Sequence, residues 1–541
     1  MLDSKDKMTQ SSTKIFNTTG PCIPDRHYML PVLPRLPEVS ELIKGDFYFI
    51  IHAPRQSGKT TLLKSLTATI NSSWERHALY CSLEALDGIV DRDKGISAIA
   101  STIFTTLLKM DYVDTEKFIE EYKSFPPLDS ATKIQYLLDY ICANLDKPLI
   151  IFFDEADCVS EEPLITFLRQ IRLGYINRYD IKDKLSFPSS IALIGMRDIR
   201  DYLTMTRHES ESKQLASPFN IKKKALTLAN FTYDEIKILY SQHTDASGQI
   251  FEDSVFDRAW YWTEGQPWLV NALAYEAVCE ILKNDYSKPV TGEIIDYAAA
   301  ILIKRRDTHI DSLIERLKEP RVARVLDSLF AGTMSYISVT DEDQQYCIDL
   351  GLVVANEKDE LRPSNAMYRE VMVRIITDQI QKILVKTIPF FPWTDGKVIF
   401  MSNILKEFQQ FWRKGSLSFP FRENKYIAHL YDEALYSFIL EAFLQRLVNS
   451  EASVIRELSI GRGAVDIGII FQKREYIIEV KLKGEDSLKS SLAQLARYLE
   501  TNNEKEGWLV IFDRNRRKKW DQKITWDTKE YDGKIIHVVG C

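Results

Sequence analysis

The sequence predicts a multidomain α/β protein: a core of parallel strands, a helical region, a helix–hairpin region and a second, smaller α/β domain. Three observations lead to this prediction. Short apolar runs alternate with longer amphipathic stretches between residues 46 and 228, which is typical of buried parallel strands linked by helices. From Thr232 to about Lys304 the strand pattern stops and amphipathic helices follow one another. Near the C-terminus, two helical patterns precede a hairpin, a helix and a strand.

Composition narrows the class of protein. The 541 residues are 45% hydrophobic and 27% charged, values that exclude wholesale disorder. Lysine and arginine number 70 against 77 acidic residues, a net charge of -7, so a globally basic nucleic-acid coat is excluded. The apolar runs are too short to span a bilayer, the N-terminus does not read as a secretory signal, and the seven cysteines are widely spaced. We therefore expect a cytoplasmic protein with reduced thiols and no membrane partner.

The chain divides into six expected segments. Five apolar runs of the second segment predict parallel strands: Phe47–His52, Ala78–Leu83, Leu149–Phe153, Ser190–Ile194 and Ala225–Leu228. Helices followed by a small hairpin suggest a winged helix in the fourth segment. The expected boundaries are 1–22 for a flexible N-terminus, 23–230 for the α/β core, 231–304 for the helical region, 305–380 for the winged-helix-like region, 381–424 for a linker with helices and 425–541 for the C-terminal domain.

A phosphate-binding loop follows the first strand. Residues 53–61 read APRQSGKTT, the pattern G-x-x-x-x-G-K-[ST] with Ala53 in the first glycine position, and an apolar helix starts at Leu62. Backbone N–H groups at a helix N-terminus and a lysine bind phosphate oxygens, and the next hydroxyl binds Mg²⁺. We expect ATP to contact this loop and Thr60 to contact Mg²⁺ as well. The expected nucleotide-binding residues are Arg55, Gln56, Ser57, Gly58, Lys59, Thr60 and Thr61.

Two carboxylates end the strand Leu149–Phe153. Asp154 is placed to hold Mg²⁺, and Glu155 to orient or polarise the attacking water as the catalytic base. Residues 154–157 also spell D-E-A-D, which raises the alternative of a DEAD-box helicase. Such helicases need a second α/β domain and a Ser-Ala-Thr element after this strand, whereas the following stretch here is helical. We therefore reject the helicase.

Two arginines follow the strand Ser190–Ile194. Arg197 or Arg200 could reach a γ-phosphate, either in the same chain or from a neighbouring subunit. Salt bridges with the nearby Asp198 or Asp201 are an equally good interpretation. The sequence leaves these alternatives open.

Five segments of the chain resemble those of a known protein family. The segments APRQSGKTT, FFDEAD, SIALIGMRDIRDY, ASPFNIKKKALTLANFT and EGQPWLVNALA together resemble bacterial AAA-like ATP-binding proteins, which are similar to archaeal-type and STAND P-loop ATPases. The resemblance covers roughly residues 20–375. It implies a P-loop ATPase core with a helical lid and a winged helix, and ATP with Mg²⁺ as cofactors. It also implies nucleotide contact by the Gly-x-Pro turn of the lid, which falls on Gly265 and Pro267.

Three ionisable residues lie in apolar strands near the C-terminus. Asp466 lies in one strand of a predicted hairpin, and Glu479 and Lys481 lie in the other. A tip centred on Lys473 and Arg474 would set Asp466 opposite Lys481 and place all three ionisable side chains on one face. Two carboxylates at this spacing can share a divalent cation, and the lysine can stabilise a phosphorane-like transition state. The alternative is a half-buried hairpin with a salt-bridged edge.

This pattern resembles the D…E-x-K motif of PD-(D/E)xK, restriction-endonuclease-like nucleases, over about residues 425–512. The resemblance implies a C-terminal α/β restriction-endonuclease-like domain. In it, Asp466 and Glu479 would be metal ligands, Lys481 would be catalytic, and the metal would be Mg²⁺ with Mn²⁺ as an alternative. Val465 stands where the family name has proline.

The surrounding helices extend this resemblance. Glu433 lies where many members of the family place an additional acid, and Glu441 and Glu457 compete for that role. Gln494 and Tyr498 form an i, i+4 pair on the helix after the hairpin, as in several branches of the family. We count Glu433 and Gln494 as expected catalytic residues.

The combined prediction is an ATP-binding and ATP-hydrolysing protein that controls a metal-dependent nuclease acting on DNA, with RNA as an alternative. Self-association on ATP binding and a role in defence or mobile-element biology follow by analogy with the families alone. The basic run 514–520 either contacts a nucleic-acid backbone or forms a solvated loop. The rival function is a nucleotide-switched sensor or scaffold whose C-terminal domain binds nucleic acid or protein without cleaving.

Overall fold

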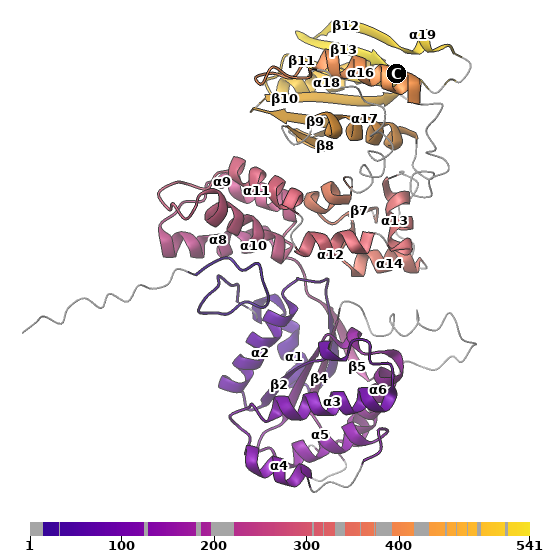
Figure 1. The fold of residues 1–541 in the computed structure, drawn as a ribbon. Helices are drawn as coiled ribbons and strands as arrows, with labels where there is room; N and C mark the ends of the chain where they lie inside the picture. Colours follow the sequence, from indigo (N-terminus) through magenta and orange to yellow (C-terminus); the bar gives the residue numbers. More distant parts are fainter. Residues whose placement is uncertain are drawn as a thin grey trace, which may run out of the picture. The chain divides into compact units, whose positions relative to one another are not determined.

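The computed structural model divides the chain into two compact units, which are described separately (Figure 1). Unit 1 contains Met1–Ala298 and Asp349–Gly351, and unit 2 contains Ala299–Ile348 and Leu352–Cys541. No helix in the described part is long and apolar enough to cross a membrane. The described residues are 14–31, 33–123, 128–179, 186–195, 221–305, 308–317, 319–330, 341–356, 359–372, 374, 392–415, 432–448, 452–460, 463–472, 474–483, 488–513, 515 and 518–541.

A five-stranded parallel sheet forms the centre of unit 1, in the order β2-β3-β4-β1-β5. Each predicted apolar run overlaps one of these strands. The three middle strands are buried, as sheets covered by helices on both faces require. This confirms the predicted α/β core. The strands are β1 (Tyr48–His52), β2 (His77–Ser82), β3 (Leu149–Asp154), β4 (Ser190–Gly195) and β5 (Lys222–Thr227).

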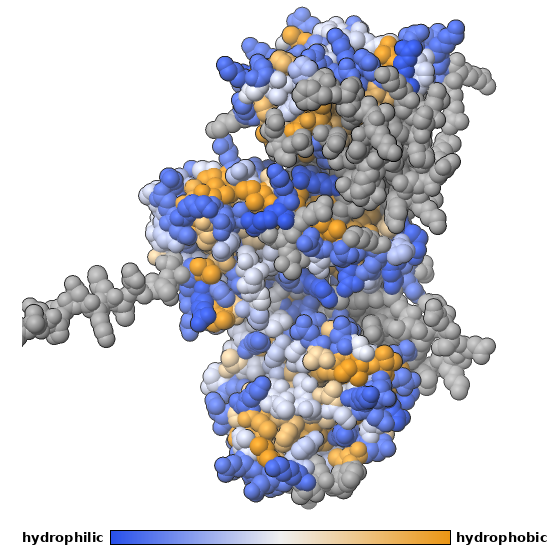
Figure 2. All heavy atoms as spheres, in the orientation of Figure 1, coloured by the Kyte–Doolittle hydropathy of each residue, from blue (hydrophilic) through white to orange (hydrophobic). Residues whose placement is uncertain are grey.

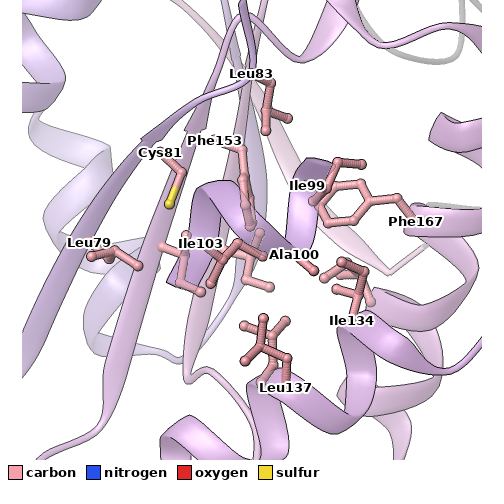
Figure 3. Packing of buried hydrophobic residues seen from close by; sticks show 14 of the residues in the cluster. Leu79, Cys81, Leu83, Ile99, Ala100, Ile103, Ile134, Leu137, Phe153 and Phe167 are labelled. Atoms are coloured by element: carbon pink, nitrogen blue, oxygen red, sulfur yellow. The ribbon is translucent and has the colours of Figure 1, made fainter. Parts of the chain in front are cut away.

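Helices cover both faces of this sheet. Side chains of α3, α5 and α6 pack on one face against residues such as Leu79, Cys81 and Phe153 (Figure 3). Side chains of α1 and α2 pack on the other face, against residues such as Phe49 and Phe152. The helices are α1 (Pro37–Lys44), α2 (Lys59–Ser73), α3 (Arg92–Leu107), α4 (Thr115–Lys123), α5 (Lys133–Asn144) and α6 (Glu161–Asn177), with short turns η1 (Leu33–Arg35), η2 (Glu84–Leu86) and η3 (Ala156–Cys158).

From Thr232 onward the chain is helical, as predicted. Thr232 caps α8 through a capping box with Glu235, and Gly248 ends this helix in a left-handed conformation with φ of 78°. We call this helical region, α8 to α11, the lid. Its elements are α8 (Tyr233–Ser247), α9 (Asp253–Thr263), α10 (Pro267–Tyr275), the π-helical turn η4 (Glu276–Ile281) and α11 (Gly292–Arg305).

Residues 14–22 differ from the predicted flexible N-terminus. Phe16 is only 1% exposed and its ring contacts those of Tyr28 and of Tyr240 and Phe251 in the lid. The hydroxyl of Tyr28 is also 3.1 Å from Nδ1 of His243. One buried aromatic side chain therefore anchors a segment whose composition is otherwise polar. Residues 1–13 lie outside the described part.

After the last part of α11, which begins unit 2 at Ala299, come three helices and a small hairpin. The hairpin pairs Val353 with Pro363 in antiparallel register, where the sequence predicted a charged tip between two short strands. This helix–hairpin order agrees with the expected elements, and the winged-helix assignment itself stays a prediction. The elements are α12 (Thr308–Leu317), α13 (Pro320–Phe330), α14 (Glu342–Asp349), β6 (Val353–Ala355) and β7 (Leu361–Pro363).

A six-stranded mixed sheet forms the end of unit 2, in the order β12-β13-β11-β10-β9-β8. Strands β10, β11 and β13 are mutually parallel, and the remaining pairs are antiparallel. The strand β8 and the hairpin β12–β13 were not among the predicted elements. The strands are β8 (Ser453–Ile460), β9 (Gly463–Phe471), β10 (Arg474–Leu482), β11 (Glu506–Phe512), β12 (Thr525–Tyr531) and β13 (Lys534–Gly540).

Two helices pack on one face of this sheet and one on the other. Residues of α16 (Met401–Gly415) and α17 (Asp432–Val448) share a core with β9, β10 and β11. Residues of α18 (Leu488–Thr501) pack on the opposite face, and the short helix α19 (Trp520–Lys523) precedes β12. The structure differs from the predicted linker 381–424, because the apolar side of α16 belongs to the core of the C-terminal domain. On the drawn face of the protein, hydrophilic and hydrophobic areas are mixed (Figure 2).

Candidate functional site

The predicted phosphate-binding loop has the expected strand–loop–helix context. It joins the end of β1 to the start of α2 at Lys59. Gln56 and Gly58 have left-handed backbone conformations, with φ of 55° and 89°, and such conformations let a short loop curl around an anion. Ser57 Oγ is buried and has no hydrogen-bond partner among the described residues. A polar atom left in this state inside the loop fits a phosphate-binding role.

The side chain of Lys59 is held against the phosphate-binding loop by hydrogen bonds. Its ammonium donates to the carbonyl oxygens of Ala53 at 2.8 Å and Pro54 at 2.9 Å. Burial lowers the pKa of Lys59, and the nearby carboxylates, led by Glu155, oppose this shift. The side chain is only 5% exposed. Lys59 therefore has few other conformations to lose when it exchanges its carbonyl partners for phosphate oxygens.

Asp154 and Thr60 meet where Mg²⁺ would be held. Thr60 Oγ1 donates to Asp154 Oδ2 at 2.8 Å, and the backbone N–H of Glu155 donates to Asp154 Oδ1 at 3.0 Å. A hydroxyl and a buried carboxylate in contact are oxygen donors of the kind that Mg²⁺ prefers. The residues present therefore fit the cation that a P-loop ATPase uses with ATP.

Glu155 begins the turn η3 in a left-handed conformation, with φ of 55°. Burial raises the pKa of Glu155, Asp154 and Asp157 raise it further, and Lys59 opposes them. A half-buried carboxylate with a raised pKa suits a group that holds or polarises a water molecule. The structure thus brings Lys59, Thr60, Asp154 and Glu155 together, as the sequence predicted.

Lys59, Thr60 and Glu155 line a cavity of about 540 Å³, and Asp154 lies buried behind them. Three parts of unit 1 form its walls: the phosphate-binding loop, the lid and the N-terminal segment. Lid residues Pro267 and Trp268 line the cavity, whereas Gly265 does not. The residues that line the cavity include Asn17, Cys22, Arg55, Gln56, Ser57, Gly58, Lys59, Thr60, Thr61, Glu155, Pro267 and Trp268.

Gly265 shapes the lid rather than lining the cavity. Its φ is 75°, and a Cβ at this position would lie 1.8 Å from the carbonyl oxygen of Phe231. The next residue, Gln266, donates from Nε2 to the carbonyl oxygen of Gln56 at 3.3 Å. The Gly-x-Pro turn therefore connects the lid to the phosphate-binding loop, and of its two predicted nucleotide-binding residues Pro267 faces the cavity.

The N-terminal wall is the part of the site that the sequence analysis missed. The backbone N–H of Cys22 donates to Thr61 Oγ1 at 2.9 Å, and Trp268 Nε1 donates to the carbonyl oxygen of Thr18 at 2.8 Å. These contacts join the segment to α2 and to the lid. Phe16, an apolar residue in a polar stretch, was the one available signal. Arg197 and Arg200 lie outside the described residues.

The second predicted set lies on the sheet of unit 2, in a register that differs from the prediction. Phe471 pairs with Arg474 and Ile467 with Ile478. The predicted pairing of Asp466 with Lys481 is therefore wrong by two residues, because only two residues connect the strands. A shift of two leaves every side chain on its face. Continued along the strands, this register brings Asp466 beside Glu479.

Asp466, Glu479 and Lys481 share the face that α18 covers. Ile477, two residues before Glu479, packs with α18, whereas Ile478 and Val480 pack with the core on the other face. Lys481 Nζ is 3.1 Å from Glu479 Oε1, and Asp466 Oδ2 accepts from the backbone N–H of Val480 at 2.7 Å.

Glu479 is a buried carboxylate. It is 1% exposed, and its Oε2 has no hydrogen-bond partner among the described residues. Burial, followed by the neighbouring Asp466, raises the pKa of Glu479 to about 7, and Lys481 opposes both. No group of three or more His, Cys, Asp or Glu residues arranged for a metal is found in the described part. Protein ligands to a cation here would be the two carboxylates.

The predicted accessory residues are placed in part. Gln494 Nε2 donates to the hydroxyl of Tyr498 at 3.3 Å on α18, as the i, i+4 spacing predicted. Glu433 lies in α17, but its side chain is outside the described part, as is that of Glu457. Glu441 is buried and its Oε1 accepts from Gln445 Nε2 at 2.9 Å.

The basic run 514–520 is described in part. Arg514, Arg516 and Arg517 lie outside the described residues. Lys518 lies 2.8 Å and Lys483 lies 3.3 Å from Asp513 Oδ2. Burial raises the pKa of Asp513, but Lys518, the backbone N–H of Asn515 and Lys483 together lower it to about 2.

Comparison with solved structures finds similar chains at low identity. A Walker-type ATPase of Pyrococcus abyssi is 15% identical with a TM-score of 0.45, over 66% of this chain and 99% of that one. The ORC2 protein of Aeropyrum pernix is 15% identical with a TM-score of 0.39, over 64% and 93%. The RuvB Holliday junction branch migration motor of Thermotoga maritima is 12% identical with a TM-score of 0.33, over 63% and 95%. No curated protein matches.

Two family models match the chain. A domain of unknown function, DUF8371, matches residues 399–516 and so includes α16 as well as Asp466, Glu479 and Lys481. An AAA-like domain matches residues 38–373, a span that contains the phosphate-binding loop, Asp154, Glu155 and the lid. With more than half of its length matched by this model and the site geometry described above, the chain belongs to the AAA-like domain family of P-loop ATPases.

Proposed function

We propose that this ATPase controls a metal-dependent nuclease formed by its own C-terminal domain, with DNA as the preferred substrate. One observation carries the proposal. Glu479 is a buried carboxylate with a free Oε2, on the same sheet face as Asp466 and with Lys481 3.1 Å away. A buried carboxylate is costly unless it binds something, and a divalent cation is the partner that two carboxylates select.

The order of elements supports a restriction-endonuclease-like domain. A helix, three antiparallel strands, a second helix and a parallel strand follow one another as α17, β8–β10, α18 and β11. The acidic residues occupy the two central strands of this series, and the lysine follows the second acid by two positions. Gln494 and Tyr498 lie on α18, the helix that covers the same face.

The roles of the three side chains follow from their chemistry. Asp466 and Glu479 would hold Mg²⁺ or Mn²⁺, which as a bound cation polarises a phosphate oxygen. Lys481 is not a cation ligand, and its ammonium would stabilise negative charge on the phosphate or orient water. Burial raises the pKa of Glu479 and the ammonium of Lys481 opposes this shift, so a bound cation would further favour the ionised carboxylate.

At the ATPase site, we propose a separate role for each side chain. Lys59 would bind the β- and γ-phosphates, Thr60 and Asp154 would hold Mg²⁺, and Glu155 would orient the attacking water. We also retain the proposal that Arg197 or Arg200 of a neighbouring subunit completes this site, so that ATP promotes self-association. Light scattering with and without a non-hydrolysable ATP analogue tests that proposal, and an unchanged mass contradicts it.

The experiment that tests the nuclease uses the full chain with plasmid and single-stranded substrates, Mg²⁺ or Mn²⁺, and ATP present or absent. Asp466→Ala should lose both cleavage and Mn²⁺ binding. Lys481→Ala should lose cleavage but keep Mn²⁺ binding. Asp527→Ala is the matched control, because Asp527 is an exposed acid of the same sheet, paired with Lys529. No cleavage of any substrate together with no Mn²⁺ binding would favour the rival scaffold.

A further inference from the structure

Tyr80 contacts the magnesium-site carboxylate from a strand that the P-loop motif does not include. Its hydroxyl lies 2.9 Å from Asp154 Oδ2. The same oxygen accepts from Thr60 Oγ1 at 2.8 Å, while Oδ1 accepts from the Glu155 N–H at 3.0 Å. Asp154 therefore accepts three hydrogen bonds, two of them on one oxygen.

The fold positions both residues of this contact, Tyr80 and Asp154. Tyr80 lies opposite Phe152 in the parallel pair β2–β3, so Asp154, two residues beyond Phe152, points to the same side of the sheet. That side carries α2, and Tyr80 packs against its core cluster. Lys64 of α2 also lies with Nζ 5.4 Å from the centre of the Tyr80 ring. The ring is held between strand and helix, and its hydroxyl reaches Asp154.

Tyr80 is the donor in this hydrogen bond. An ionised carboxylate can only accept, so the phenolic O–H donates to it. Burial and the adjacent Asp154 both raise the pKa of Tyr80, so the hydroxyl keeps its proton throughout the physiological range.

We propose that Tyr80 is a positioning residue for magnesium in the ATPase site. A carboxylate oxygen has two main acceptor positions, and on Asp154 Oδ2 they are used by Thr60 and Tyr80. The plane of the carboxylate is thereby fixed, and Oδ1 keeps one acceptor position for the cation or its hydrating water. Without Tyr80, only Thr60 on Oδ2 and the N–H of Glu155 on Oδ1 restrain the last torsion angle of Asp154, which is intrinsically broad. This inference rests on the ATPase family and is independent of the nuclease proposal.

Tyr80→Phe tests the inference, because it removes the hydroxyl and keeps the ring. In EDTA, the variant should bind a fluorescent ATP analogue as tightly as the wild type. The Mg²⁺ concentration that gives half of the magnesium-dependent gain in binding should rise about tenfold, the size expected for one lost hydrogen bond to a charged group. ATP turnover should recover towards the wild-type rate at high Mg²⁺. Replacing Tyr80 by p-aminophenylalanine, which restores a donor at the ring tip, should return the Mg²⁺ midpoint towards the wild-type value.

Tyr112→Phe is the matched control. Tyr112 donates its hydroxyl to the carbonyl oxygen of Ala78 at 3.1 Å, so this variant also removes a tyrosine hydroxyl that contacts β2, but one that does not contact Asp154. Its Mg²⁺ midpoint should equal that of the wild type. Equal midpoints for Tyr80→Phe and wild type would overturn the inference. It would also be overturned if Tyr80→Phe lowered binding in EDTA and the thermal midpoint without changing the response to Mg²⁺, since that result indicates a packing role alone.

Discussion

Lys59 and Glu155 perform different tasks in ATP turnover, although each affects the pKa of the other. Lys59 is the positive charge that the loop offers to the phosphates, so Lys59→Ala should abolish tight ATP binding. Glu155→Gln keeps the shape of the site and leaves Asp154 intact, so binding should persist while hydrolysis stops. Equilibrium binding and single-turnover hydrolysis of ATP separate the two effects.

Glu162→Gln provides the control for the second variant. Glu162 is an exposed acid in the first turn of α6, so its loss removes the same charge from unit 1 without altering the water-orienting carboxylate. It should hydrolyse ATP at the wild-type rate. Normal turnover in Glu155→Gln would refute the assignment of Glu155 as the catalytic base.

The proximity of predicted residues could be inferred from the sequence where the motif is local. Lys59 and Thr60 are adjacent in the chain, and Asp154 and Glu155 end a buried strand, so pattern and spacing locate them. The pairing of Asp466 was wrong because alternation along a strand determines the face of a side chain but not its partner. Two residues rather than four close the hairpin, and nothing in the charged tip distinguishes these alternatives. Tyr80 was missed because its role depends on which strand lies beside β3.

At the scale of elements, strands and helices with long apolar patterns were predictable. The N-terminal segment was not, because Phe16 is stabilised by rings of α8 and of the loop before α9, which are distant in the chain. The same reason applies to α16, whose apolar side packs against β10 and β11. Elements that are stabilised mainly by long-range contacts carry little local signal of where they belong.

Helix α12 should be sensitive to acid. His309 in this helix lies with Nε2 2.6 Å from the hydroxyl of Tyr368, and burial lowers the pKa of His309 to about 4. An unfolded histidine has a pKa near 6.5, so between about pH 6.5 and 4 the unfolded state binds more protons. The stabilisation is therefore complete above about pH 6.5 and is lost as the pH falls towards 4. Its upper limit is on the order of 3 kcal/mol.

Hydrogen exchange of the α12 amides, corrected for intrinsic rates, measures this effect. Protection in the wild type should decrease between pH 7 and pH 5. His309→Gln keeps a polar group beside Tyr368 but does not titrate, so its protection should be lower at pH 7 and almost independent of pH. The same loss of protection on acidification in both proteins would show that another group is responsible.

At the scale of the whole molecule, the chain carries an ATPase site in unit 1 and the proposed nuclease site in unit 2. The positions of these two sets of residues were predictable because each belongs to a short motif beside or within an apolar strand. The boundary of the C-terminal domain was not, because α16 lies upstream of the motif-bearing strands. Whether ATP controls cleavage is a question of coupling between the two sites. That question follows from the proposed function, since an unregulated nuclease would threaten its own host.

If ATP binding controls cleavage, Lys59→Ala should reduce cleavage by the full chain severalfold or more, although Asp466, Glu479 and Lys481 are unchanged. The reverse need not hold: Asp466→Ala should eliminate cleavage and leave ATP turnover at the wild-type rate, because hydrolysis depends on residues of unit 1. Measuring both activities on the same preparations, with ATP, ADP and a non-hydrolysable analogue, separates control by binding from control by hydrolysis. Glu155→Gln then decides between them, because it should bind ATP without turning it over. Cleavage that is equal in wild type, Lys59→Ala and Glu155→Gln, for every substrate and nucleotide, would mean that the two domains are joined by the chain and act independently.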